Sequence, residues 1–599
     1  LSTMTAERLA IGFAAQREGN FPVAETCYRE ILLEDPINAD AQYLLGFLCH
    51  QQGLEQEALH HIQEAVAQRP REPQFAKTLG DVFLALNDRE RARECYHRSL
   101  RENPAPVDSY IALGALAAAD KQLDEAVQWY RRAVDADPTS ATSFLGLGCA
   151  LRDLENFEGA DRCLSIAVRL KPQGPEALAA LGEVKMKRGL FTEAEVLFRQ
   201  SLKEKPSSPS VLNNLGSALK ELGRPGEAID LYLEAYRLDP CEPAVSFNLG
   251  GAYSAIGSIP EAIQWYDIAT DTHPDYAEAH ANKALLLLSS GMFERGWQEY
   301  EWRFKLRDRR QKIDGRTFPV PRWEGESFEG KTLLVRSEQG AGDMIQFCRF
   351  LPALKSRGGR VLFETAPRLS RLFKNVDGAD AVVPISQTTE TEFDLFIPLL
   401  SVPRFFTPHP DAIPSRESYL FAEPELIART APLFQPGSFN VGICWQGNRE
   451  YVGDKDRSMP LKMFAPLFNI AGVRFYSLQK GDGAEQLGSL PPDLIVEELG
   501  STLDNGGDGF VETAAALTHL DLVISTDTAL PHLAGALGRP VWVLLSSSPE
   551  WRWFTAGDRT PWYPTMRLFR RRRGEEWKSV IERVSASLAA AAEAKTHTH

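Results

Sequence analysis

The sequence lacks the features that would assign it to several large classes of protein. None of its eight cysteines lies in a C-x-x-C pair, so neither a zinc site nor a disulfide framework is indicated, and we expect a reducing cytoplasmic compartment. Apolar runs such as 284–288 fall far short of the ~20 residues that span a bilayer, so no integral membrane segment is expected. The first twenty residues mix charges of both signs with apolar residues, which is not the pattern of a secretory signal. A net charge of −15 argues against a nucleic-acid partner.

What is present is an ordinary globular composition over a long chain. The 599 residues are 43% apolar and 25% charged, which argues against a disordered or collagen-like chain. At ~150 residues per domain, this length predicts about four domain-sized units, ample for large buried cores.

A 34-residue period runs through the first half of the chain. Glycine recurs at this interval from Gly12 to Gly250, alanine from Ala24 to Ala262, and proline from Pro36 to Pro274, in eight copies each. Three residue types locked to one period predict a helix–turn–helix unit, in which the glycine lets two helices approach and the proline ends the second. The pattern resembles the tetratricopeptide repeat. It predicts an α-solenoid, a tetratricopeptide superhelix, over residues 1–304.

A ninth, altered unit is expected to cap this stack. It begins near Ala277 and carries Gly296 and Trp297 where the other units read alanine and a polar residue. Terminal repeats are usually atypical, and the aromatic residues of this one are expected to pack onto the next domain.

A column of asparagines marks the groove-facing side of the last repeats. The residue two positions before the repeat glycine becomes Asn214 and then Asn248, and its counterpart in the capping unit is Asn282. Amides spaced one per repeat can bond the backbone of an extended peptide whatever its sequence, so these residues are the predicted acceptor groove. The column resembles the asparagine ladder of tetratricopeptide-containing O-linked N-acetylglucosamine transferases. The other reading is a polar residue that is merely tolerated there.

The second half begins at a basic segment and then changes pattern. Residues 305–330 are expected to be a basic linker, a solvated connector continuing the Arg- and Lys-rich run 303–316. Short apolar runs then alternate with helical stretches, once over 331–436 and again over 437–592, and 593–599 is expected to be a tail. The runs are 332–336, 360–364, 380–384, 394–398, 439–445, 473–478, 494–498, 521–525 and 541–545. This alternation predicts two parallel α/β domains, both Rossmann-like. Two such domains facing a cleft are the architecture of the GT-B glycosyltransferases.

A glycine-rich turn follows the first of these runs and leads into a helix. It contains Gly342 and Asp343. Asp343 has two readings: a helix N-cap worth ~1 kcal/mol, or a carboxylate that takes the proton from an attacking hydroxyl.

A second strand-to-helix turn lies in the last sheet. Asp527, Thr528 and Ala529 connect the run 521–525 to a helix, whose N-terminal N–H groups favour a phosphate. His532 lies one turn into that helix, where it is either a packing residue or a contact to phosphate or sugar.

Further donor-side candidates lie at or beyond the ends of two other runs. They are Trp445, Gln446, Lys455, Arg457, Gln479 and Lys480. A cation at 455 or 457 would neutralise a donor phosphate, and the polar pair at 479–480 would meet a base or ribose edge. Asp454-Lys455-Asp456 is interpreted as a loop, so no metal site is predicted, and no resident cofactor is expected beyond the donor as co-substrate.

Two motif blocks resemble the bacterial lipopolysaccharide heptosyltransferase family. The first is Gly342-Asp343-Met344-Ile345 with 351–354, and the second is Asp527-Thr528-Ala529 with 532–534. The resemblance implies an inverting, metal-independent GT-B enzyme with Asp343 as base and 527–529 as the phosphate turn. It also implies an acceptor side in 331–436 and a nucleotide-sugar side in 437–592. Ala529 departs from the glycine of that family.

The whole layout resembles bacterial fusions of tetratricopeptide repeats with such a transferase domain. The joining segments 296–304, 321–326 and 338–343 carry this resemblance, and the best-understood members resemble flagellin O-glycosyltransferases. It implies a protein O-glycosyltransferase that moves a nonulosonic acid such as pseudaminic acid from a CMP-linked donor to Ser or Thr of flagellin. Two alternatives stay open: a lipopolysaccharide or polysaccharide sugar transferase, and a non-catalytic repeat scaffold with a degenerate transferase domain.

Overall fold

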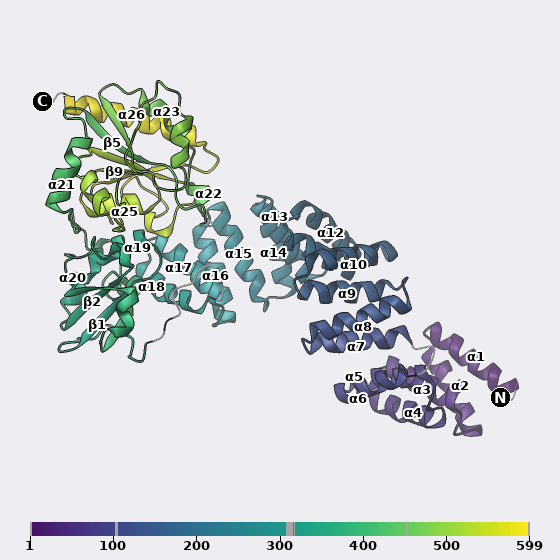
Figure 1. Ribbon diagram of the computed structural model, residues 1–599. Coiled ribbons are helices and arrows are strands. Elements are labelled where there is room, and N and C mark those ends of the chain that lie inside the picture. The colour runs from purple at the N-terminus through teal and green to yellow at the C-terminus, as the bar shows by residue number, and fades with distance from the viewer. Residues whose placement is uncertain (1–2, 102–105, 307–315, 317, 451–452, 597–599) are drawn as a thin grey trace. The chain divides into compact units, whose positions relative to one another are not determined.

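The computed structural model describes residues 3–101, 106–306, 316, 318–450 and 453–596. They form two compact units, Leu1–Ser258 and Ile259–His599, which are treated separately below. Figure 1 shows the helical first unit in purple to blue and the α/β part of the second in green to yellow.

The first unit is a series of antiparallel helix pairs, as the 34-residue period predicts. Its helices are α1 (Thr3–Arg17), α2 (Phe21–Glu34), α3 (Ala39–Gln51), α4 (Glu55–Gln68), α5 (Pro73–Ala85), α6 (Arg89–Ser99), α7 (Val107–Ala119), α8 (Leu123–Ala136), α9 (Ala141–Asp153), α10 (Phe157–Leu170), α11 (Pro175–Lys187), α12 (Phe191–Glu204), α13 (Pro209–Glu221), α14 (Pro225–Leu238) and α15 (Pro243–Ile256). They stack as a tetratricopeptide solenoid, which confirms the predicted fold of this half.

The repeat glycine and alanine have the roles that their spacing suggests. A Cβ on Gly80 would lie 2.6 Å from Cε1 of Tyr96, and one on Gly216 equally close to Tyr232, so only glycine lets the paired helices approach. The repeat alanines, such as Ala92 on α6, are fully buried on the second helix of each pair. Each pair buries its apolar faces against its neighbours, which is how repeat arrays build a continuous core.

The second unit starts with the last three repeat helices. These are α16 (Ile259–Thr272), α17 (Ala277–Ser289) and α18 (Phe293–Tyr300), followed by a 3-10 turn at Glu301–Lys305. Trp297 on α18 is buried, donates its indole N–H to the carbonyl of Thr407 at 3.1 Å, and meets Trp551 edge to face at 5.4 Å. The aromatics of the altered ninth unit therefore belong to the core of the α/β part.

The first α/β sheet is fully parallel, with the order β3-β2-β1-β4. Its strands are β1 (Thr332–Arg336), β2 (Arg360–Thr365), β3 (Ala381–Pro384) and β4 (Leu395–Pro398), with α19 (Ala341–Phe347) and α20 (Leu351–Lys355) between β1 and β2. Leu334 pairs with both Leu362 and Phe396. The strand order reverses between β1 and β4, which makes the carboxyl end of β1 a topological switch point.

The second sheet is also parallel, with the order β10-β9-β8-β5-β6-β7. Its strands are β5 (Phe439–Cys444), β6 (Val473–Ser477), β7 (Glu497–Glu498), β8 (Leu522–Thr526), β9 (Val541–Leu545) and β10 (Met566–Arg570). Its helices are α21 (Pro424–Thr430), α22 (Asp454–Arg457), α23 (Ala465–Phe468), α24 (Val511–Leu517), α25 (Ala529–Ala536) and α26 (Trp577–Thr596). The order reverses between β5 and β8. Two parallel α/β sheets in succession are the predicted GT-B arrangement.

Two boundary expectations need correction. Helix α26 continues to Thr596, and Lys595 bonds Asp521 at 2.7 Å, so the described residues of the expected tail, 593–596, are helical. In the basic segment, residues 307–315 and 317 lie outside the described residues. Two of its arginines are not solvated as expected, because Arg303 is buried against Glu338 at 2.9 Å and Arg316 bonds the buried Glu364 at 2.8 Å, whereas Lys305 is 60% exposed.

Candidate functional site

The two motif turns lie at the switch points of the two sheets and meet each other. Asp343 is in the first turn of α19, directly after β1, and Asp527 follows β8 at the start of α25. Helices α19 and α25 pack together within the second unit (Figure 1). A Cβ on Gly342 would lie 3.1 Å from Cδ2 of His532 and 3.4 Å from Cα of Ala529. The closeness of Gly342 to α25 brings residues 342–343 next to 527–532.

Asp343 has two polar partners, one on its own turn and one distant in sequence. Its Oδ2 accepts the backbone N–H of Gly340 at 3.1 Å, so Gly340 is the N-cap of α19 and Asp343 supports the cap from the third helical position, not as the predicted N-cap residue. Its Oδ1 accepts a hydrogen bond from the guanidinium of Arg552 at 2.5 Å. The side chain of Asp343 is 15% exposed, so the carboxylate is largely but not wholly covered.

Arg552 is a site residue that the sequence analysis missed. It lies in the short 3-10 helix Trp551–Trp553 after β9, with 8% of its side chain exposed, and also pairs with Glu550. The tryptophans on either side of it are packing residues, as their type suggests: the ring of Trp553 stacks on His532 with 5.2 Å between the ring centroids. The sequence did contain one signal: a single arginine between two large apolar residues is expected to be buried, and a buried cation needs an anionic partner.

Asp527 is a buried carboxylate beside two cations. Burial raises its pKa, and the charges of Arg552 and Arg457 oppose that rise. Thr528 follows it as a half-buried residue, and its hydroxyl lies 3.4 Å from that of Ser525. Ala529 opens α25, so the turn presents the N-terminus of that helix, where free N–H groups and the helix dipole favour an anion.

His532 is a buried packing residue. It is buried, its Nδ1 lies 2.9 Å from the hydroxyl of Tyr563, and its ring stacks on Trp553. Burial holds its pKa well below the usual 6.5, and the nearby charges of Arg552, Arg349 and Arg457 lower it further. Of its two predicted readings, the structure supports the packing one.

Three of the residues expected to contact the nucleotide-sugar donor instead make contacts within the protein. Trp445 is fully buried in the core of the second sheet. The amide oxygen of Gln479 accepts from the backbone N–H groups of Trp445 and Gln446. Its amide nitrogen donates to the carbonyls of Gln446, Lys480 and Asp482, so Gln479 joins the loops after β5 and β6. The side chain of Gln446 accepts from Gln486 at 2.9 Å. A polar residue that follows a strand can join neighbouring loops as well as bind a ligand, and Gln446 and Gln479 do the former.

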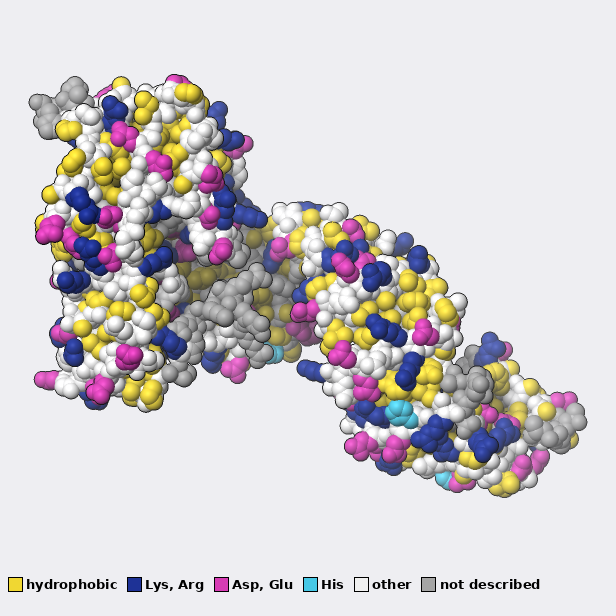
Figure 2. All heavy atoms as spheres, in the orientation of Figure 1, with side chains coloured by type: hydrophobic (Ala, Val, Ile, Leu, Met, Phe, Trp, Pro, Cys, Tyr) yellow, Lys and Arg dark blue, Asp and Glu magenta, His cyan; other side chains and the backbone are white. Residues whose placement is uncertain are grey.

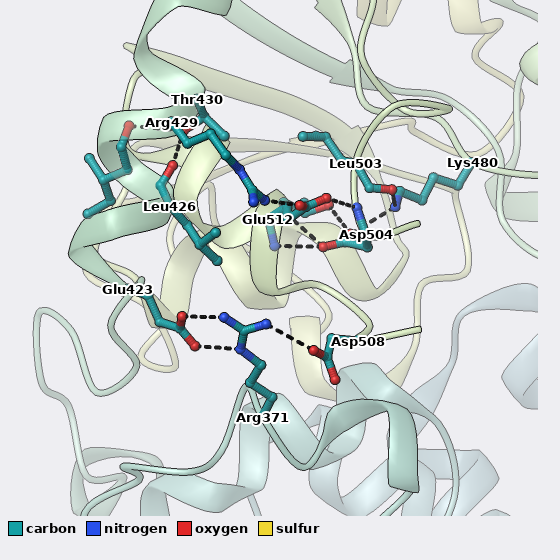
Figure 3. A network of polar contacts seen from close by, with 12 residues as sticks. Arg371, Glu423, Leu426, Arg429, Thr430, Lys480, Leu503, Asp504, Asp508 and Glu512 are labelled. Atoms are coloured by element: carbon teal, nitrogen blue, oxygen red, sulfur yellow. Dashed lines mark hydrogen bonds and ion pairs between the residues drawn. The ribbon is translucent and has the colours of Figure 1, made fainter. Parts of the chain in front are cut away.

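Lys480 is likewise held by the fold, as Figure 3 shows. Its ammonium donates to the carbonyl of Leu503 at 2.6 Å and to Asp504 at 2.8 Å. Asp504 also accepts the backbone N–H groups of Glu512 and Thr513, which fixes the start of α24. Lys480 therefore joins the loop after β6 to the start of α24, and 38% of its side chain stays exposed.

Of the two basic candidates after β5, Arg457 is the one that faces the site. Its guanidinium packs against the loop after β5, because a Cβ on Gly447 would lie 2.7 Å from one of its nitrogens. Its Nε donates to Asp454 at 3.3 Å. Its charge acts on both Asp527 and His532. Lys455 is exposed. Asp454 is buried at the start of α22, so the predicted loop is a single short helical turn.

The asparagine column makes contacts within each unit. In the first unit, the side-chain N–H₂ of Asn214 donates to Glu183 at 3.1 Å, and that of Asn248 donates to Asn213 at 2.9 Å. In the second unit, Asn282 approaches the hydroxyl of Tyr266 at 3.4 Å. These amides form part of polar tracks that join successive repeats.

On the face drawn in Figure 2, basic and acidic side chains are interspersed over the second unit. Within the described ranges, no group of three or more His, Cys, Asp or Glu side chains is placed to hold a metal ion. None of the described helices combines the length and apolar character needed to cross a bilayer.

Comparison with known families matches both halves of the chain. Residues 9–73 match the tetratricopeptide repeat, and 51–287 match the C-terminal domain of cilia and flagella-associated protein 70. Residues 508–580 match glycosyltransferase family 9, the heptosyltransferases.

Individual relatives cover parts of the chain. Protein FlbA of Caulobacter vibrioides is 28% identical over 348 residues, 52% of this chain and 55% of FlbA, so the match spans about half the length of that curated relative. Among solved structures, the hetero-tetramer Cut9-Hcn1 has 21% identity and a TM-score of 0.38, covering 45% of this chain and 52% of that one. The repeat protein YrrB has 23% identity and a TM-score of 0.28, covering 32% and 99%.

Proposed function

We propose that this chain, which carries tetratricopeptide repeats followed by a glycosyltransferase family 9 domain, transfers a sugar from a nucleotide donor to a Ser or Thr hydroxyl of a protein held by the repeats. The observation that carries the proposal is the meeting of Asp343 with the 527–529 turn at the switch points of two parallel sheets. Such switch points are where open α/β sheets bind ligands.

The transfer step follows from the chemistry of these groups. Asp343 accepts the proton of the acceptor hydroxyl as its oxygen attacks the anomeric carbon of the sugar. The bond between that carbon and the donor phosphate oxygen breaks, and the electron pair leaves with the nucleotide. The N-terminus of α25 and the cation Arg457 stabilise the negative charge that develops on the leaving phosphate. Attack opposite to the leaving group inverts the anomeric carbon.

We extend the proposal to the identity of the acceptor and the donor. The joining segments resemble those of flagellin O-glycosyltransferases, so we propose flagellin as acceptor and a CMP-linked nonulosonic acid as donor. A repeat array that occupies half of the chain suits a protein acceptor better than a glycan acceptor, because stacked repeats create extended binding surfaces. In this assignment, Asn214, Asn248 and Asn282 contribute to acceptor capture.

The test is ligand-induced stabilisation of the purified chain. The thermal midpoint is followed with CMP, UDP, GDP and ADP in turn, because a ligand that binds only the folded state adds about 2.7 kcal/mol of stability at a hundredfold excess over its Kd. Stabilisation by CMP alone supports the nonulosonic-acid donor. Stabilisation by another nucleotide alone keeps the transferase and replaces the donor. The absence of any shift supports the scaffold alternative.

A further inference from the structure

We propose that Arg552 is an exchangeable counter-ion: it holds Asp343 before the donor arrives, then turns to the donor phosphate and leaves the Asp343 carboxylate ready to take a proton. This rests on the proposed function, because it assigns a new role within the same site. It makes donor binding the event that activates the base, so the donor binds productively before the acceptor reacts.

The first support is the position of Arg552 between two anion-binding elements. One of its guanidinium nitrogens lies 2.5 Å from Oδ1 of Asp343, at the start of α19. Burial raises the pKa of Asp527, at the turn that opens α25, and the positive charge of Arg552 opposes that rise. A phosphate bound at that helix N-terminus would therefore lie close to the same guanidinium.

The second support is an unused donor. Within the described part of the chain, the buried Nε of Arg552 makes no hydrogen bond, and only 8% of the side chain is exposed. A buried N–H group without a partner costs free energy, so an acceptor that reached this Nε would remove that cost. A phosphate supplies several strong acceptor oxygens and binds guanidinium in a bidentate manner.

The third support concerns Asp343 itself. Its Oδ1 accepts from Arg552 and its Oδ2 accepts from the backbone N–H of Gly340, so both carboxylate oxygens are already engaged before an acceptor hydroxyl arrives. An uncharged acceptor hydroxyl cannot displace the arginine, because it offers no compensating charge. A donor phosphate can, since it brings its own negative charge to Arg552 and restores the balance of charge around the pair.

The exchange predicts that Asp343 and the nucleotide compete for one arginine. Asp343→Asn removes the competitor, and we expect it to bind the stabilising nucleotide of the CMP, UDP, GDP and ADP panel at least about fivefold more tightly than the wild type. In an Arg552→Gln background, the same Asp343→Asn change should alter affinity less than about twofold. Arg552→Lys keeps a charge without the planar fork, so it should retain part of the gain.

The binding measurement is isothermal titration of all six proteins, with the Asp343 carboxylate present or replaced in each of the Arg, Lys and Gln backgrounds at 552. A fivefold gain that depends on Arg552 supports the exchange. An equal gain in all three backgrounds shows a general field effect and overturns it, as does no gain in the wild-type background. If Arg552→Gln does not fold, the Arg552→Lys background decides. A smaller affinity gain from Asp343→Asn in that background than in the wild type supports the exchange, and an equal gain overturns it.

Failure of the proposed function has a different signature. In that case no nucleotide of the panel binds the wild type, so both proposals fall together. Nucleotide binding without coupling between positions 343 and 552 overturns the exchange alone and leaves the transferase assignment standing.

Discussion

Gly342 and His532 lie against each other, although they belong to helices that follow strands of different sheets: a Cβ on Gly342 would be 3.1 Å from Cδ2 of the histidine. His532 is backed by Trp553 and Tyr563, so it has little room to move away. The contact sets how closely α19 and α25 approach. It therefore also sets the separation of Asp343 from the 527–529 turn.

Enlarging Gly342 should push these helices apart. We expect Gly342→Val to lower the free energy of unfolding by about 1–3 kcal/mol, because overpacking a close contact forces neighbours to shift. Gly340→Ala is the matched control, since its Cβ would meet nothing nearer than Asp343 Oδ2 at 3.6 Å. Chemical denaturation measures both variants. Equal stability of the two would contradict the argument.

Asp343→Ala should abolish sugar transfer while the fold persists. The assigned base is removed, and general-base catalysis contributes typically 10²–10⁴-fold to a rate. Transfer to a Ser- or Thr-containing acceptor is measured by intact mass, with nucleotide binding as the control for folding. Full residual turnover with intact binding would exclude Asp343 as the base.

His532 should make stability depend on pH near neutrality. Its pKa lies well below 6.5 in the folded protein, while the unfolded chain takes up a proton on this residue below about pH 6.5. More protons bind to the unfolded state as pH falls, so its contribution is complete above pH 6.5 and is lost below it, by ~1.4 kcal/mol per pH unit.

The measurement is the thermal midpoint of the wild type and of His532→Gln between pH 8 and pH 5.5. Other groups titrate in both proteins, so only the difference between the two curves reports on the histidine. We expect the advantage of the wild type to shrink as pH falls below 6.5. Parallel curves would mean that the ring is not held neutral.

Asp504 should matter far more than the nearby surface arginine (Figure 3). The side chain of Asp504 is 4% exposed and accepts from the backbone of Glu512, from Thr513 and from Lys480, so Asp504→Ala should cost about 2–4 kcal/mol. Arg371 bridges Glu423 and Asp508 on the surface, and Arg371→Ala should cost under about 1 kcal/mol. Urea denaturation of the two variants ranks them. A reversed order would contradict the burial argument.

Truncating Trp297 should destabilise the α/β part of the chain. The indole is buried and its N–H is hydrogen-bonded to Thr407, so Trp297→Ala should cost about 3–5 kcal/mol through lost contacts and a cavity. Leu154, an exposed residue of the first unit, provides the control as Leu154→Ala. Near-ultraviolet circular dichroism during unfolding follows the tryptophan-rich α/β core. An unchanged transition for Trp297→Ala would show that α18 is not part of that core.

The fold could be predicted because its signals are periodic and local. A 34-residue period specifies helix pairs without any distant contact, and the runs at 332–336 and 439–445 correspond to β1 and β5. Strand β10 gave a weaker signal, because Arg567 and Arg570 interrupt its apolar pattern.

The site was harder to predict because its partners are distant in sequence. Arg552 and Asp343 are 209 positions apart, and no spacing rule relates them. Gln479 looked like a ligand contact because it is polar and follows a strand, yet its amide serves two neighbouring loops. Whether a polar side chain binds another part of the chain or an incoming molecule depends on tertiary contacts, which local pattern does not contain.

The altered ninth repeat unit has a consequence for how such proteins can diversify. The compact unit that contains both sheets begins at Ile259, and Trp297 of α18 is part of its core. Genetic exchange or duplication of repeats upstream of α16 leaves that core untouched. A breakpoint at residue 304 instead cuts the α/β core away from its own tryptophan. A change in repeat number that preserves this core must therefore keep α17 and α18 together with the two sheets.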